Sequence, residues 1–162
     1  MIIESKLEAV CLVLASSNFG KIKEFRNLLS GFPFKLISQP EGFDVEENGK
    51  TFAENARLKA VAASSLTGQF ALADDSGLMV KSLSGAPGVH SARYASNDKE
   101  RILRLLREME SFDDRSATFH SSLCIVKPNN EVLIEVEGVC EGFITNAPRG
   151  KNGFGYDPVF EV

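Results

Sequence analysis

The stretch TFAENARLKAVAASSLTGQFALADDSGLMVKSL (51–83) joins a helix pattern to a strand pattern and then to a pair of acids. It opens with Thr and Glu in capping-box spacing, and the Ala-rich residues that follow favour a helix over 51–64. FALAD (70–74) has the apolar pattern of a buried strand that ends at DDSG. LMVKSL (78–83) predicts a second strand after a turn at those residues.

Helix and strand patterns also alternate before this stretch. AVCLVLA (9–15) is a continuous apolar run of strand length, which is typical of a strand buried on both faces. KIKEFRNLL (21–29) predicts an amphipathic helix, and FKLIS (34–38) predicts a second short strand. The buried side of the helix should be formed by Ile22, Phe25, Leu28 and Leu29.

After the stretch, a helix pattern is followed by a pair of strands. SNDKERILRLLREME (96–110) begins with cap candidates, and its buried side should contain Ile102, Leu103, Leu105, Leu106 and Met109. ATFHSSLCIVK (117–127) and VLIEVEGVCEGFI (132–144) flank the turn signal PNNE, so they should pair antiparallel. We therefore expect an α/β protein with a mixed sheet, in which NAPRGKNGFGYDPVF (146–160) is a long irregular loop.

Composition favours a single globular domain over residues 1–162, with a net charge of -4 and 43% hydrophobic residues. The negative charge disfavours a nucleic acid polymer as partner. Cys11, Cys124 and Cys140 are an odd number without metal-ligand spacing, which predicts reduced core thiols in a cytoplasmic protein. The first apolar run is too short and its preceding residues too acidic for a signal peptide, and no run is long enough to span a membrane.

The turn SSNFGK (16–21) offers phosphate-binding groups between a predicted strand and a predicted helix. It lacks the glycine and hydroxyl spacing of a Walker A loop. Ser16, Asn18 and Lys21 nevertheless place hydroxyl, amide and ammonium donors at a helix N-terminus, which favours anions. The alternative is that Ser or Asn only caps the helix.

Asp74 and Asp75 are adjacent carboxylates at the expected end of a strand, where open α/β sheets form ligand crevices. A divalent cation would offset their repulsion, and an all-oxygen donor set suits Mg²⁺. Glu47, before the helix at 51–64, could complete such a site. The alternative is a solvated acidic turn whose Asp and Ser side chains bond to the backbone.

Two cations and an aromatic residue are further candidates. Lys59 lies four residues after Asn55 and so shares a helix face with it, while Arg93 is a fork-shaped donor suited to phosphate. The alternative for Lys59 is an ordinary solvated helix residue, and Arg93 suits a carboxylate as well as a phosphate. In the glycine-rich loop a planar base could stack on Phe154, although Phe154 and Tyr156 could instead fill the core.

Taken together, these blocks resemble the inosine triphosphate pyrophosphatase family. The matching blocks are ASSNFGKIKEF, TFAENARLKA, LADDSGLMV, GAPGVHSARYA and GFGYDPVF, in order over almost all of the chain. Members hydrolyse deaminated purine nucleoside triphosphates such as ITP, dITP and XTP to the monophosphate and pyrophosphate. The resemblance also implies a long mixed sheet flanked by helices, two lobes with a nucleotide-binding cleft between them, and a homodimer.

The resemblance implies roles for individual residues. Glu47 and Asp74 are similar to the family's Mg²⁺-site acids. Asp75 is similar to the base that activates water, and Lys59 to the lysine that contacts the triphosphate. The residues implied to bind substrate are Ser16, Asn18, Lys21, Ser76, Arg93, Phe154, Gly155, Tyr156 and Asp157.

The expected mechanism is attack on the α-phosphorus by water deprotonated by Asp75, with Lys21 and Lys59 stabilising the departing pyrophosphate. Family members usually continue some thirty residues past the YDP segment, through a Ser-His-Arg block that helps to recognise the base, whereas this chain stops at Val162. The expectation is therefore one pyrophosphatase domain without that segment. Two alternatives stay open: a nucleotide-binding protein without catalysis, and a pyrophosphatase of broader specificity.

Overall fold

The structure is a computed structural model that describes residues 9–162, and the acidic residues before the first strand lie outside that range. Its strands form one six-stranded mixed sheet in the order β2-β1-β3-β4-β5-β6. β1 (Val10–Leu14) lies between β2 (Phe34–Ser38) and β3 (Phe70–Val80) and is parallel to both.

The other half of the sheet is antiparallel. β4 (Ser116–Val126) pairs with β3, and β5 (Val132–Ile144) pairs with β4. β6 (Phe160–Glu161) pairs with the end of β5. The predicted α/β fold with a mixed sheet is therefore confirmed, and so is the antiparallel pair around PNNE.

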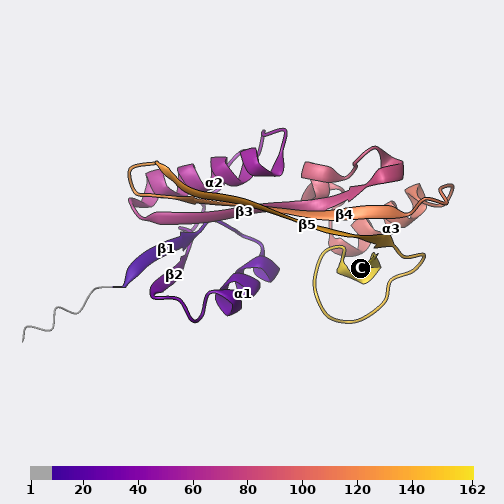
Figure 1. Cartoon of the computed structure of the whole chain (residues 1–162), viewed down its shortest axis with the longest axis horizontal. Coiled ribbons are helices and arrows are strands. Elements are labelled where there is room, and N and C mark those ends of the chain that lie inside the picture. Colours follow the sequence, from indigo (N-terminus) through magenta and orange to yellow (C-terminus); the bar gives the residue numbers. More distant parts are fainter. Residues whose placement is uncertain (1–8) are drawn as a thin grey trace, which may run out of the picture.

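Helices cover both faces of the sheet (Figure 1). α2 (Phe52–Thr67) lies on one face, while α1 (Phe19–Leu28) and α3 (Asp98–Glu108) lie at opposite ends of the other face. Three short 3-10 helices lie in the connections: η1 (Lys81–Leu83), η2 (Gly88–Arg93) and η3 (Asp157–Val159). None of the helices in residues 9–162 is long and apolar enough to cross a membrane.

The ends of α2 follow the predicted capping residues. Thr51 Oγ1 accepts a hydrogen bond from the Glu54 N–H at 3.1 Å. Glu54 reaches back as expected, but it accepts from the N–H of Lys50 and not from that of Thr51. The helix ends at Gly68, whose positive φ of 65° suits a left-handed C-cap.

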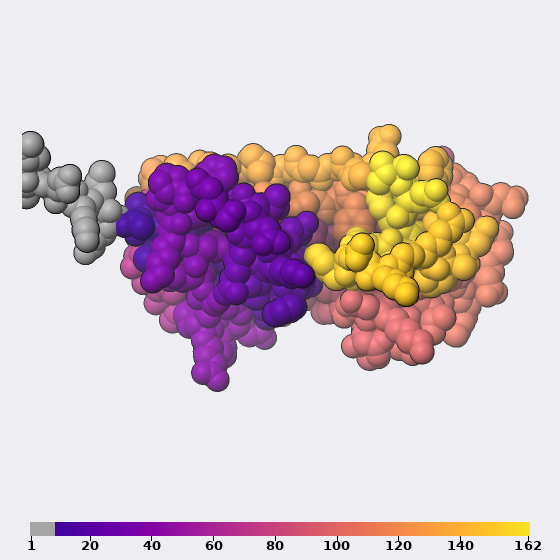
Figure 2. All heavy atoms as spheres, turned by 90° about the horizontal axis from the view of Figure 1, so that it is seen from below, coloured from indigo at the N-terminus to yellow at the C-terminus, as the bar shows by residue number. Residues whose placement is uncertain are grey.

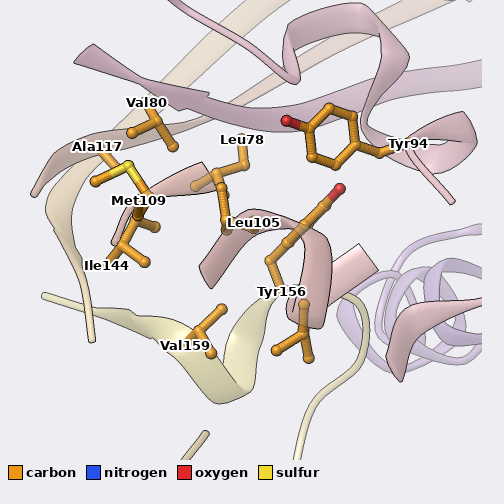
Figure 3. Packing of buried hydrophobic residues seen from close by; sticks show 10 residues of the cluster. Leu78, Val80, Tyr94, Leu105, Met109, Ala117, Ile144, Tyr156 and Val159 are labelled. Carbon is orange, nitrogen blue, oxygen red and sulfur yellow. The ribbon is translucent and has the colours of Figure 1, made fainter. Parts of the chain in front are cut away.

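Each helix packs on the sheet through its own apolar cluster, and the two ends of the sheet thus carry separate cores. The cluster against α3 includes Leu78, Leu105, Met109 and Val159 (Figure 3). Small residues of α2 pack on Ala71 and Ala73 of β3 in a second cluster. The third cluster joins α1 to the opposite face of β1 and β3.

The DDSG segment does not form the predicted turn, because β3 runs without a break from Phe70 to Val80. Its residues pair in register with β4, Asp75 opposite Ser122 and Gly77 opposite His120. Pairing with β4 satisfies the backbone groups on that edge of the strand, which outweighs the local preference of these residues for turns. The predicted second strand therefore continues the first, and its last three residues form η1.

Three side chains predicted to be buried are exposed. Leu28 and Leu103 are 65% and 44% exposed. Consecutive helix residues differ by about 100° in direction, so these two lie beside the buried stripe of their helices. Cys140 is exposed on β5, whereas Cys124 is buried, and all three cysteines are free thiols.

The position of the site follows from the unequal lengths of β1 and β3. β1 ends at Leu14 opposite Leu72, and the Ala15 N–H still donates to the Leu72 carbonyl at 2.8 Å. Beyond this point β3 continues with β4 on one side only. Within residues 9–162 one edge of β3, from Ala73 to Leu78, thus has no strand neighbour and is open to the segments around it, until Met79 bridges to Pro87.

Gly77 on this edge is packed too closely for a side chain. A Cβ there would lie 2.7 Å from the Gly88 carbonyl oxygen and would also meet Ser91 Oγ. We expect Gly77→Ala to lower the free energy of unfolding by about 1–3 kcal/mol through overpacking, as measured by urea denaturation. Gly138→Ala in β5 is the matched control, since a Cβ there meets nothing within 4 Å. Equal stability of the two variants would contradict this packing.

Candidate active site

A cleft of about 550 Å³ lies along the free edge of β3. Its walls come from the turn after β1, the loop before α2, β3 itself, η2 with the start of α3, and the loop before β6. In Figure 2 the indigo and violet N-terminal part faces the yellow C-terminal loop along one boundary. The two lobes thus meet where the strand neighbour of β3 is missing.

Asp74 and Asp75 face opposite sides of the sheet, because successive side chains of a strand alternate. Asp74 shares its face with Leu72 and Leu78, which pack in the clusters against α1 and α3. Asp75 shares its face with Ala73, which packs against α2. The alternation separates the two charges and gives each carboxylate its own surroundings.

Asp74 is paired with Lys21 of α1. The Lys21 Nζ lies 2.8 Å from Asp74 Oδ2, and the two side chains are 14% and 4% exposed. The other oxygen, Asp74 Oδ1, is buried and has no hydrogen-bond partner within residues 9–162. A buried carboxylate oxygen without a partner is costly, so an additional positive group near Asp74 would be stabilised.

Asp75 is held by two residues of α2 that were predicted to share a helix face. Asn55 is fully buried and donates from Nδ2 to Asp75 Oδ2 at 3.0 Å, and Lys59 Nζ lies 3.9 Å from Asp75 Oδ1. Burial raises the pKa of Asp75 above its ordinary value of 3.8, although Lys59 and Asn55 oppose the shift. Its carboxylate is therefore more basic than that of a solvated aspartate.

Glu47, in the loop before α2, contacts two cations. Its Oε1 lies 2.7 Å from Lys59 Nζ, and its Oε2 accepts from Arg93 Nη1 at 2.9 Å. Burial opposes ionisation of Glu47, but the hydrogen bonds and charges of Lys59 and Arg93 outweigh burial and lower its pKa. Lys59 thereby links Glu47 to Asp75, whereas the family resemblance grouped Glu47 with Asp74.

The turn after β1 both caps α1 and lines the cleft. Asn18 Oδ1 accepts from the Lys21 N–H at 3.2 Å, and Ser16 Oγ accepts from the Asn18 N–H at 3.2 Å. Ser16, Asn18 and Lys21 all line the cleft. The capping role considered as an alternative is therefore real, and it leaves the same side chains at the cleft surface.

The glycine-rich loop places two aromatic residues in different surroundings. The Phe154 ring lies against the backbone of Gly20, where an added Cβ would be 2.7 Å from ring atoms. Asp157 Oδ2 accepts from the Phe154 N–H at 2.9 Å and closes the turn. Tyr156 is buried in the core and donates from its hydroxyl to the Ser91 carbonyl at 3.0 Å.

The structure brings most of the predicted site residues to the cleft. Those that line it are Ser16, Asn18, Lys21, Glu47, Lys59, Asp75, Ser76, Arg93, Phe154, Gly155 and Tyr156. Asp74 and Asp157 are not among the lining residues, since Asp74 pairs with Lys21 and Asp157 bonds within its own turn.

Sequence reasoning missed the loop at 39–45 and the start of α3, where Asp98 and Arg101 line the cleft. Asp98 follows the N-cap Asn97. An acid in the first turn of a helix is common for electrostatic reasons alone, so nothing in the local pattern marked Asp98 as a cleft residue.

The acids of the candidate site have the donor chemistry of the expected metal. Within residues 9–162 no three His, Cys, Asp or Glu side chains already converge as a metal site. Glu47, Asp74 and Asp75 nevertheless offer only carboxylate oxygens, and Asp74 Oδ1 is unpartnered in that range. This chemistry fits Mg²⁺, which prefers oxygen ligands.

Comparison with known proteins shows similarity over nearly the whole chain. The Ham1 family model matches residues 12–162. A dITP/XTP pyrophosphatase of Prochlorococcus marinus (strain MIT 9313) is 61% identical over 151 residues, which are 93% of this chain and 74% of that relative. A dITP/XTP pyrophosphatase of Gloeobacter violaceus is 53% identical, again over 93% of this chain, and is itself covered to 77%.

Solved structures agree with this similarity. A HAM1 protein from Coxiella burnetii has a TM-score of 0.85 and 47% identity, with 94% of this chain and 82% of that chain covered. A structure titled nucleoside-triphosphatase / dITP/XTP pyrophosphatase, from Mycobacterium abscessus, has a TM-score of 0.77 and 37% identity, with 93% and 83% covered.

The pairing of Lys21 with a buried acid makes a stability prediction. Lys21→Met leaves the Asp74 carboxylate without its cation, and breaking such a buried pair should lower the free energy of unfolding by about 3 kcal/mol. Lys23→Met, two residues along the same helix and exposed, is the matched control and should be close to neutral. Chemical denaturation at neutral pH measures both. A loss no larger for Lys21→Met than for the control would show that the pair is not needed for stability.

Proposed function

The chain belongs to the Ham1 family, and on that premise we propose that it hydrolyses deaminated purine nucleoside triphosphates. It is a nucleoside-triphosphate pyrophosphatase, a hydrolase of phosphoric anhydride bonds. The substrates proposed are dITP, ITP and XTP, which it would convert to the monophosphate and pyrophosphate, thereby clearing them from nucleotide pools.

One observation carries this proposal. A buried acid with a raised pKa, Asp75, lies in a cleft that also contains Lys59 and the N-terminal turn of α1. A base, a cation and a helix N-terminus together are what attack of water on a phosphate requires. Positioning and electrostatics carry most of the rate enhancement in phosphoryl transfer.

Asp75 is proposed as the general base. Its raised pKa makes it a better proton acceptor than an ordinary aspartate, and Asn55 fixes the orientation of its carboxylate. The water deprotonated by Asp75 would attack the α-phosphorus in line with the departing pyrophosphate.

The cations would hold the phosphates. In the structure Lys21, Lys59 and Arg93 are paired with carboxylates of the protein. A triphosphate in the cleft would compete for the same ammonium and guanidinium groups and receive their hydrogen bonds. Lys21 and Lys59 would then stabilise the charge that accumulates on pyrophosphate.

Mg²⁺ is the proposed cofactor, with Glu47 and Asp74 as the residues that would hold it. When bound, Mg²⁺ would supply positive charge that offsets the negative charge of the triphosphate. Glu47 suits this role because its pKa is lowered and it stays ionised. Asp74 suits it through its buried oxygen, which has no partner within residues 9–162. Because Asp74 pairs with Lys21 and Glu47 with Lys59, the two carboxylates would have to turn toward each other to share one ion.

The loop before β6 is proposed to hold the purine. Phe154 and Gly155 line the cleft, and a flat base could stack on the Phe154 ring. Ser76 of β3 also lines the cleft, where it could contact the nucleotide. Rejection of ATP would follow if the pocket donates to a six-position oxygen, because an amino group leaves such donors unpaired.

The remaining expectations are part of the same proposal. We propose that residues 1–162 form one pyrophosphatase domain, that the protein acts in the cytoplasm and that it is a homodimer. A free nucleotide, and not a nucleic acid polymer or a membrane, is the proposed partner.

The activity is tested by release of pyrophosphate and orthophosphate from dITP, XTP, dATP, dGTP and dUTP, with and without Mg²⁺. The proposal expects Mg²⁺-dependent pyrophosphate release that is fastest with dITP and XTP. Similar turnover of dUTP or dATP would favour a broader pyrophosphatase. Binding of dITP by a folded sample without turnover would favour a nucleotide-binding protein.

Asp75→Asn removes the proposed proton acceptor and keeps a side chain of nearly the same shape. We expect kcat for dITP to fall by about 10²- to 10⁴-fold, with a much smaller change in KM. Steady-state kinetics of pyrophosphate release measure this, and circular dichroism confirms folding. Near-normal turnover in Asp75→Asn together with lost turnover in Asp74→Asn would reverse the two assignments.

The pH dependence of kcat/KM follows from the direction of the Asp75 shift. Protonation of Asp75 abolishes the base, so activity should fall as pH is lowered through its raised pKa, with a midpoint above 3.8. The positive charge of Lys59 lowers the pKa of Asp75, so Lys59→Met should move the acidic limb to higher pH as well as reduce kcat. An unmoved limb in Lys59→Met would exclude Asp75 as the group that titrates.

A further inference from the structure

The loop that carries Phe154 is held by a contact with α3. The Gly155 N–H donates to Asp98 Oδ2 at 3.1 Å, although the two residues are 57 positions apart in the chain. Asp98 is the first residue of α3, and a rigid helix is thus the support for an irregular loop. Gly155 has a φ of 61°, a conformation that keeps the loop in a tight turn at this point.

The Asp98 carboxylate is itself oriented by a second contact. Arg101 Nη1 lies 2.6 Å from Asp98 Oδ1, so that each carboxylate oxygen has a different partner. Arg101 is in turn fixed by donation from Nε to the Ala95 carbonyl at 3.3 Å. The ion pair is partly exposed and contributes little stability of its own, but it directs the other oxygen toward Gly155.

This contact acts next to the residue proposed to stack on the base. Phe154 precedes Gly155, and its ring lies against Gly20 in the turn proposed to bind phosphate. Holding Gly155 on α3 therefore fixes where the ring stands relative to the phosphate turn. A displaced ring would present a poorer stacking surface to a nucleotide whose phosphates are already in place.

We propose that Asp98 is a positioning residue for the base-binding loop, and that it sets affinity for the base end of the nucleotide through Gly155. The proposal rests on the proposed function, since it assumes that Phe154 stacks on a purine. The partners of the Asp98 carboxylate within residues 9–162 are Gly155 and Arg101 and none of the groups proposed for chemistry, so Asp98 should affect KM more than kcat.

A purely structural role of Asp98 in α3 can be separated from positioning of the loop by a control in the same turn. An acid in the first turn of α3 also stabilises the helix dipole, and Glu100 does so in the same turn. Glu100 has no side-chain contact with the loop within residues 9–162, and its backbone N–H donates a hydrogen bond to Asn97 Oδ1. Glu100→Ala therefore matches Asp98→Ala in helix effects and lacks the effect on the loop.

The test compares Asp98→Ala, Glu100→Ala and Arg101→Met with the unmodified chain. KM and kcat are measured for dITP, inhibition by inorganic tripolyphosphate probes the phosphate end alone, and amide hydrogen exchange of Gly155 is followed by NMR without ligand. For Asp98→Ala we expect KM to rise about five- to ten-fold and Gly155 exchange to accelerate, with kcat and tripolyphosphate inhibition nearly unchanged. Glu100→Ala should match the unmodified chain in all four.

Several outcomes would overturn the proposal. Equal KM values for Asp98→Ala and Glu100→Ala would show that Asp98 acts only by stabilising the start of α3. A KM rise in Arg101→Met as large as in Asp98→Ala, with Gly155 still protected, would assign the effect to the Arg101 side chain in the cleft. Absence of turnover in the unmodified chain would count against the proposed function. The contact between Asp98 and Gly155 would then be tested by amide exchange of Gly155 and by dITP binding, and equal results for Asp98→Ala and Glu100→Ala would overturn it.

Discussion

The pairing of β3 with β4 beyond the end of β1 is the constraint on which the rest of the structure depends. Because the ladder continues through the acids, Asp74 and Asp75 are held in extended backbone and must face opposite sides of the sheet. Because β1 has ended, the other edge of β3 has no strand to cover it. The cleft and the division of the two carboxylates therefore have a single origin in strand length.

The charges in the cleft are balanced within the protein. Lys21 neutralises Asp74 on the side of α1, while Lys59 lies between Asp75 and Glu47 on the side of α2. Buried charges are tolerated only when they are paired, so these contacts offset the cost of burying the carboxylates and the ammonium groups. They also keep the cations in reach of an anion that enters the cleft. Asp75 is the exception in this network, because burial outweighs its partners and raises its pKa.

The loop before β6 contacts elements on both sides of the cleft. Phe154 reaches the turn of α1 across the cleft, and Asp98 ties the same loop to α3. Tyr156 adds a third connection, since its ring is in the core and its hydroxyl bonds to η2. Through these contacts one irregular segment is connected to the turn of α1, to α3 and to η2.

The sequence by itself determined the elements, because apolar periodicity and capping residues act over a few positions. The helix after Thr51, the strands β1, β2, β4 and β5 and the pair around PNNE all follow from such local patterns. Most of the predicted site residues also line the cleft, because hydroxyl, carboxylate and cationic groups at the ends of elements can be recognised in the sequence. Tertiary structure decided the course of DDSG, since pairing with a distant strand overrode turn propensity. It also decided that Lys59 joins Glu47 to Asp75 and that Asp98 supports Gly155, because contacts between residues far apart in the chain depend on how the elements pack.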